Sequence, residues 1–64
     1  MIKFILLDGQ YLNIYQITNI EQDYENVRVQ MSNGTCAFVY DTTAEEVIKR
    51  IKEKENETDN AKKE

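Results

Sequence analysis

A chain of 64 residues can bury only one modest hydrophobic core. A domain of about 60 residues buries only about 60% of the surface that its unfolded chain exposes, so small domains often need a disulfide, a metal ion or a second subunit. Cys36 is the only cysteine, and there is no histidine, so neither an intramolecular disulfide nor a Cys/His zinc site can form. We expect one domain that depends on close packing or on association with another chain.

The charge balance argues against a nucleic-acid partner. Eight Lys and Arg residues stand against twelve Asp and Glu residues, which gives a net charge of −4. A protein that binds phosphates needs the opposite sign. The apolar run from Phe4 to Leu7 ends at Asp8 and is too short for a signal peptide or a membrane span. We expect a cytoplasmic protein that does not insert into a membrane and does not bind nucleic acid.

The strongest local signal is Asn33-Gly34. A two-residue type I′ turn needs positive φ at both central positions, and Asn-Gly tolerates this best. This turn would pair Val29 with Phe38 and Met31 with Cys36. Cys36 would then be buried and would behave as a small hydrophobe. The core face of this hairpin is predicted to carry Val27, Val29, Met31, Cys36, Phe38 and Tyr40.

A second turn, at Asp8-Gly9, joins residues 2–7 to residues 10–15 as another hairpin. Both of its faces are largely apolar, which is typical of a strand covered on both sides. The second cover could be a C-terminal helix, a closed barrel interior or a second subunit, and a bulge near Leu7 could shift the register. One face would carry Ile2, Phe4, Leu6, Tyr11 and Tyr15, and the other would carry Ile5, Leu7, Leu12 and Ile14.

A helix is predicted from about Thr43 to Lys54. It begins with a capping box, because Thr42 or Thr43 is followed three residues later by Glu45 or Glu46. Its apolar stripe consists of Ala44, Val47, Ile48 and Ile51.

These elements predict an α+β fold, a small antiparallel sheet or SH3-like barrel of four to five strands with one C-terminal helix. The domain is expected to span residues 1–54. Beyond it the sequence is charged and polar apart from Ala61, so residues 55–64 are predicted to form a disordered charged tail.

Little in the sequence supports catalysis or metal binding. Histidine, the commonest general base, is absent, and the lone cysteine is predicted to be shielded. Glu21, Asp23 and Glu25 alternate, but neighbours on one strand face lie about 7 Å apart and diverge, which does not suit one ion. We expect no enzyme activity, no cofactor and no metal.

Tyrosine and acidic side chains are the candidate contact residues. Tyrosine suits an interface because it combines a large apolar ring with a polar tip. A protein partner or a second copy of the chain could use these side chains. The candidates are Tyr11 and Tyr15 on the first hairpin, and Glu21, Asp23, Tyr24 and Glu25 before the second.

The order of these pieces resembles the small flagellar FlbD family, which includes swarming-motility SwrD proteins. The resemblance covers about residues 1–51. It implies a non-enzymatic accessory protein that supports flagellar power or swarming through contact with other proteins, and it carries over no catalytic residue. The matching segments are Ile2-Lys3-Phe4, Leu7-Asp8-Gly9, Tyr11-Leu12-Asn13, Ile17, Ile20-Glu21, Val27 to Gly34, and Glu45-Glu46-Val47-Ile48 through Ile51.

Two alternatives stay open. A phage or mobile element could encode such a short chain as an acidic inhibitor of a host protein. Residues 22–26 are also longer and more acidic than the corresponding turn of the family, a difference that bears on the partner. The Asn13, Ile17 and Ile20 spacing and the Asn-Gly hairpin also resemble LytTR DNA-binding domains. This chain lacks the length and the basic loops of that domain.

Overall fold

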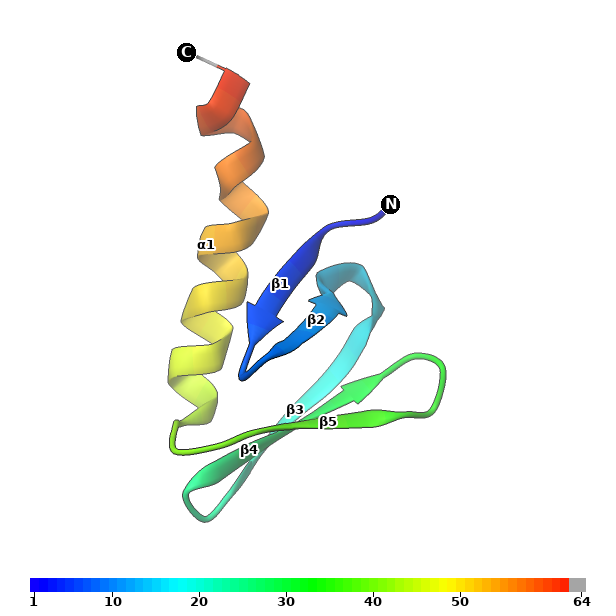
Figure 1. The fold of residues 1–64 in the computed structure, drawn as a ribbon, viewed down its shortest axis with the longest axis vertical. Coiled ribbons are helices and arrows are strands. Elements are labelled where there is room, and N and C mark those ends of the chain that lie inside the picture. Colours follow the sequence, from blue (N-terminus) through cyan, green and yellow to red (C-terminus); the bar gives the residue numbers. More distant parts are fainter. Residues whose placement is uncertain (63–64) are drawn as a thin grey trace.

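The chain folds into two small antiparallel sheets and a C-terminal helix (Figure 1). The structure is a computed structural model, and it describes residues 1–62. Side chains are described for residues 1–57. Within the described range, the α+β fold with five strands and one C-terminal helix is confirmed, but the strands do not close into a barrel. The elements are β1 (Phe4–Leu7), β2 (Gln10–Asn13), the 3₁₀ turn η1 (Ile14–Gln16), β3 (Ile17–Asp23), β4 (Asn26–Met31), β5 (Cys36–Val39) and α1 (Ala44–Lys62).

The first hairpin has the predicted two-residue turn. Asp8 (φ 52°) and Gly9 (φ 80°) both lie in the left-handed region that a type I′ turn requires. Leu7 therefore pairs with Gln10 and Leu6 with Tyr11. The predicted division of the two faces is confirmed, because Ile5, Leu7, Leu12 and Ile14 are buried and Ile2, Phe4, Leu6, Tyr11 and Tyr15 are exposed.

The second hairpin differs from the prediction, because its connection has three residues instead of two. Only Gly34 (φ 92°) has positive φ there. Its N–H donates to the carbonyl of Met31 (3.0 Å), and the N–H of Met31 donates to Thr35 (2.9 Å). This is a type I turn followed by a left-handed glycine that forms a bulge, the commonest three-residue hairpin loop.

The longer loop shifts the pairing by one residue. Val29 pairs with Ala37 rather than with Phe38. A shift of one residue moves every side chain of a strand to the opposite face. The predicted burial of Cys36, Phe38 and Tyr40 is therefore wrong: all three are exposed, and their neighbours Ala37 and Val39 are buried.

Strand β3 bends to keep two isoleucines on the core. The register with β4 shifts between Ile17 and Asn19. Such a bulge places one extra residue in a strand, so Ile17 and Ile20 both pack against the core although they are three residues apart.

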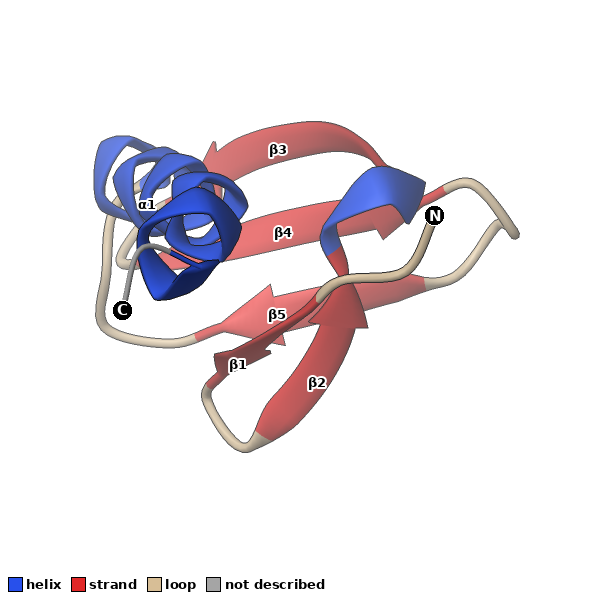
Figure 2. Cartoon of the chain, turned by 90° about the horizontal axis from the view of Figure 1, so that it is seen from above, coloured by secondary structure: helices blue, strands red, loops and turns tan. Residues whose placement is uncertain are grey.

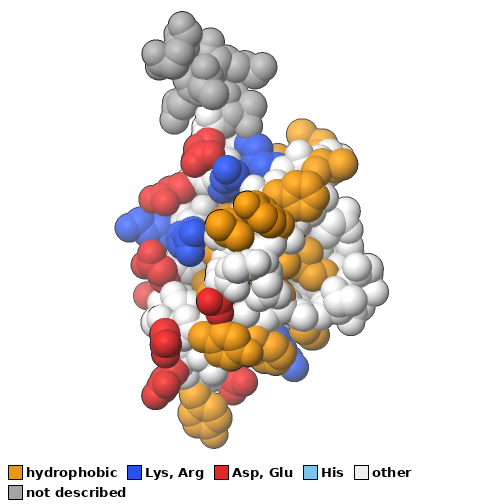
Figure 3. All heavy atoms as spheres, in the orientation of Figure 1, with side chains coloured by type: hydrophobic (Ala, Val, Ile, Leu, Met, Phe, Trp, Pro, Cys, Tyr) orange, Lys and Arg blue, Asp and Glu red, His pale blue; other side chains and the backbone are white. Residues whose placement is uncertain are grey.

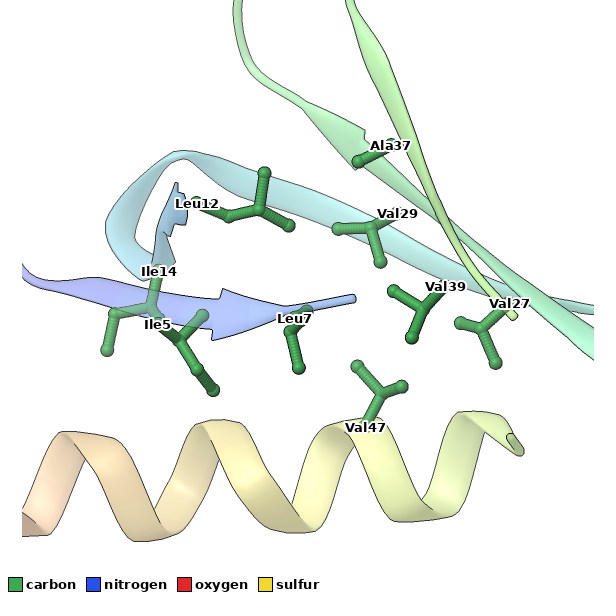
Figure 4. Close-up of a cluster of buried hydrophobic side chains, with 9 residues drawn as sticks. All are labelled: Ile5, Leu7, Leu12, Ile14, Val27, Val29, Ala37, Val39 and Val47. Carbon is green, nitrogen blue, oxygen red and sulfur yellow. The ribbon is translucent and has the colours of Figure 1, made fainter. Parts of the chain in front are cut away.

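The core lies between the two sheets and α1 (Figure 4). Val47 reaches from the helix toward Leu7, Val39 and Val27. Ile51 is partly buried one turn further on, whereas Ile48, which was predicted to lie on the same apolar stripe, is exposed. The buried side chains in the described part of the chain are Ile5, Leu7, Leu12, Ile14, Val27, Val29, Ala37, Val39 and Val47.

Helix α1 lies at one of the two places where the sheets stay unpaired. It lies beside the free edge of β1, where the Arg50 guanidinium donates to the Leu6 carbonyl (3.1 Å) and the Lys3 ammonium donates to the Glu55 carbonyl (3.0 Å). Its first turn reaches the end of β3, where Gln22 Oε1 accepts from the N–H of Ala44 (2.6 Å). Figure 2 shows α1 beside one end of the β3–β4–β5 sheet. The helix thus occupies the gap between β1 and β3 that a barrel would close with strand pairing.

The helix begins as predicted and ends later. Thr43 Oγ1 accepts from the N–H of Glu46 (3.2 Å), as a capping residue does. The backbone stays helical to Lys62, beyond the predicted end at Lys54, because Glu and Lys are good helix formers that need no buried face. Disorder of the tail stays a prediction, and its residues 63 and 64 lie outside the described residues. No helix within the described residues is long and apolar enough to span a membrane.

Candidate functional site

The outward side of the first sheet is the most unusual surface of the molecule. Five large side chains lie on it, and we call them the outer β1–β2 face: Ile2, Phe4, Leu6, Tyr11 and Tyr15. Ile2 and Tyr11 are the most accessible, with 74% and 70% of their surface exposed. The opposite side of the same hairpin forms the core, so the helix and the second sheet cover only one of its two apolar sides.

The size of this face sets it apart from scattered surface hydrophobes. Large apolar and aromatic side chains each present about 200 Å², and the exposed fractions of the five residues together correspond to about 550 Å². The largest apolar patch of an ordinary monomer is about 300–600 Å² and is often functional. Figure 3 shows the apolar side chains gathered over β1. The outer β1–β2 face therefore lies in the upper part of the range for the largest apolar patch of a monomer, which is often functional.

Hydrogen bonds hold this face in shape. Asn13 Oδ1 accepts from the N–H groups of Lys3 and Tyr15, each at 3.2 Å, which ties the start of the chain to η1. The carbonyl of Lys3 also accepts from the N–H of Ile14 (2.9 Å). These bonds fix the backbone beside Phe4 and Tyr15. This role of Asn13 could not be predicted from the sequence, because a single polar residue in a strand carries no periodic signal.

The exposed end of β5 lies beside the turn of the first hairpin. Gln10 Nε2 donates to the Phe38 carbonyl (3.0 Å), and the N–H of Tyr40 donates to Asp8 Oδ2 (3.2 Å). These bonds replace a strand ladder between β5 and the first sheet. Figure 3 shows a second group of apolar side chains near this end of β5, separated from the first group by polar atoms. Phe38 and Tyr40 therefore extend the apolar surface but do not belong to the outer β1–β2 face.

The structure separates the predicted contact residues into two groups. Tyr11 and Tyr15 lie on β2 and η1, whereas Glu21, Asp23, Tyr24 and Glu25 lie at the far end of the β3–β4 hairpin (Figure 1). Tyr24 is almost fully exposed, with a positive φ of 56°. Glu25 lies in the turn after β3, so it does not continue the strand alternation of Glu21 and Asp23.

Glu21 has an internal partner. It forms an ion pair with Arg28, directly opposite on β4, and it also accepts from Asn19 Nδ2 (2.9 Å). The hydrogen bond and the positive charge of Arg28 lower the pKa of the Glu21 carboxyl, and the same contact raises the pKa of Arg28. Within the described residues, no three acidic or thiol side chains lie close enough together to hold a metal ion.

Gln22 organises the base of this hairpin, and the sequence analysis did not find it. Its Nε2 donates to the carbonyls of Tyr24 (2.7 Å) and Asn26 (3.1 Å), and its Oε1 caps the first turn of α1 at Ala44. The N–H of Thr42 donates to the Glu25 carbonyl (3.0 Å). The position of Tyr24 is thus tied to the start of the helix.

No protein family, curated protein or solved structure matches the chain.

Proposed function

We propose that this chain is a small non-enzymatic protein-interaction module whose contact surface is the outer β1–β2 face. The observation that carries the proposal is the exposure of large apolar side chains on a rigid hairpin whose other side is already the core. Tyrosine, which supplies two of the five side chains, is enriched among the few residues that dominate the energy of protein interfaces. Resemblance to the FlbD and SwrD family makes a component of the motility apparatus the first partner class to test.

Four of the eight Lys and Arg residues already have partners within the chain, which favours a protein partner over nucleic acid. Lys3 and Arg50 donate to backbone carbonyls at the β1–α1 boundary, Arg28 pairs with Glu21, and Lys54 pairs with Glu57 (3.1 Å). Side chains held in this way are not directed at phosphates, and a net charge of −4 opposes binding to a polyanion.

Crosslinking in the native cell tests the proposal. The full chain would be compared with Phe4→Lys, which places a charge in the face, and with Tyr24→Lys, which makes an equal charge change on the distant hairpin. We expect Phe4→Lys to lose its crosslinked protein products while Tyr24→Lys keeps them. Circular dichroism of both variants controls for folding. Loss of the products only in Tyr24→Lys would move the contact surface to the β3–β4 turn and contradict the proposal.

A further inference from the structure

We infer that a second copy of this chain covers the outer β1–β2 face, so that the protein is a two-fold symmetric dimer. The inference rests on the proposed function and names the occupant of its contact surface. In a two-fold interface the same patch serves both copies, so the patch must be complementary to itself in shape and in charge.

The area of the face is close to the minimum for such a dimer. The five side chains of each copy expose about 550 Å², so two copies can bury at most about 1,100 Å² through them, close to the roughly 1,000 Å² that a specific interface needs. Met1, Phe38 and Tyr40 lie outside the defined face, are exposed, and add to this area wherever the second copy reaches them.

The charge distribution permits a second copy, because contact through this face would bury no charged side chain of the face. All five side chains of the face are uncharged. Lys3, which alternates with them on the same segment, extends toward α1 and bonds to the Lys54 and Glu55 carbonyls. Two copies with a net charge of −4 each repel one another unless their charged surfaces stay apart. Contact through this face keeps Glu21, Asp23 and Glu25 at the outer ends of the dimer.

The anchors suit a face-to-face arrangement. Leu6 lies directly opposite Tyr11 on the hairpin, so the centre of the face pairs an aliphatic with an aromatic side chain. In a two-fold stack, Tyr11 of one copy packs over β1 of the other, and its hydroxyl reaches water at the rim. The chain has few buried residues, and a dimer supplies apolar burial that a domain of this size lacks.

Sedimentation equilibrium of the full chain over a concentration range of about 1 to 500 μM tests the inference. We expect a mass of twice 7.6 kDa at the upper end. Tyr11→Lys should weaken the dimer at least about 30-fold, as removal of a central anchor does. Tyr24→Lys, with the same change of charge and volume on the other hairpin, should leave the dimer constant within about threefold.

Three outcomes would overturn the dimer. These are a monomer mass at all concentrations, a dimer that Tyr11→Lys leaves intact, and equal weakening by both substitutions. Circular dichroism shows whether Tyr11→Lys folds, and Tyr11→Ser replaces it in the same experiment if it does not. A monomer that still loses its crosslinked products with Phe4→Lys would refute the dimer and leave the proposed function in place. Retention of those products by Phe4→Lys would refute the proposed function itself.

Discussion

Neighbouring residues of β5 have opposite environments. Ala37 is buried against the core, and Cys36 faces solvent on the same side of the sheet as Arg28. An aspartate at position 37 would bury an unpaired charge, whereas an aspartate at position 36 would remain hydrated near a guanidinium.

A matched pair of substitutions tests this register. We expect Ala37→Asp to unfold the chain, because an unpaired buried charge costs several kcal/mol against a total stability of about 5 kcal/mol. Cys36→Asp should change the free energy of unfolding by less than about 1 kcal/mol. Urea denaturation followed by circular dichroism measures both. The opposite result would restore the register that a two-residue Asn33-Gly34 turn requires.

The Glu21–Arg28 pair predicts a small pH dependence of stability. Because the pKa of Glu21 is lowered in the folded state, the unfolded state binds more protons as pH falls. The pair therefore stabilises the fold above the ordinary glutamate pKa, and the contribution is lost as pH falls through the lowered value. Glu21→Gln should destabilise most at pH 7 and least near pH 3, a range that spans the ordinary pKa of about 4.3.

The urea midpoints of wild type, Glu21→Gln and Glu25→Gln at both pH values check this expectation. Glu25→Gln removes the same charge from the turn without touching Arg28, so it controls for net charge. Because the pair is exposed, added salt should reduce the difference between wild type and Glu21→Gln. A Glu21→Gln effect that does not change with pH would contradict the role of the pair.

The residue scale also shows where sequence reasoning succeeds and where it stops. Asp8-Gly9 could be placed correctly because Asp-Gly favours a two-residue type I′ turn, and both residues do adopt positive φ. Asn33-Gly34 is compatible with two loops, since glycine also serves as the left-handed residue of a three-residue loop. The two loops differ by one residue in length, and only tertiary packing of Ala37 and Val39 decides between them.

At the scale of elements, the β3–β4 hairpin and α1 are coupled through one side chain. Gln22 caps the helix at Ala44 and also bonds to the Tyr24 and Asn26 carbonyls. The helix start could be predicted from Thr43 and Glu46, because capping residues are local in sequence. The contribution of Gln22 could not, because it is made across 22 positions of the chain. Likewise, the alternation of the strands predicted that Tyr11 and Tyr15 share one face, while the exposure of that face and the bonds that Asn13 makes beside it depend on the folded chain.

Replacement of Gln22 measures this coupling. Gln22→Ala should lower the free energy of unfolding by about 1–2 kcal/mol, because it removes a helix cap and the hydrogen bonds donated to the turn. Gln22→Glu keeps the capping oxygen but puts a carboxylate oxygen where Nε2 donates to the Tyr24 and Asn26 carbonyls, so it should destabilise at least as much as Gln22→Ala. Chemical denaturation ranks the three proteins. Equal stability of wild type and Gln22→Ala would show that the hydrogen bonds of Gln22 contribute nothing to the free energy of unfolding.

At the scale of the whole molecule, α1 divides into a part that holds the fold and a part that extends beyond it. Val47 and Ile51 enter the core or pack against it, and Arg50 bonds to the free edge of β1. Glu55 is the last helix residue whose carbonyl accepts a hydrogen bond from the Lys3 ammonium, and residues 55–57 are exposed. The division of the helix follows the apolar stripe, which could be seen in the sequence, although the continuation of the helix backbone to Lys62 could not.

Two truncations test this division. Deletion of residues 56–64 should leave the melting temperature within a few degrees of wild type, because it removes no buried side chain among those described. Deletion of residues 47–64 should abolish cooperative unfolding, because it removes Val47, Arg50 and Ile51. Differential scanning calorimetry compares both with the full chain. A fall of more than about 10 °C in the shorter deletion would mean that the tail docks on the domain.

The place of α1 in the gap between β1 and β3 also governs how the chain matures during synthesis. The ribosome makes these strands before the helix. The edges of β1 and β3 that lie beside α1 are therefore uncovered until Ile51 has left the exit tunnel. Uncovered strand edges are templates for pairing with other nascent chains on the same messenger RNA. Completion of the fold is therefore a late event, and a truncated chain released after residues 47–51 would be an aggregation-prone product rather than a shortened working domain.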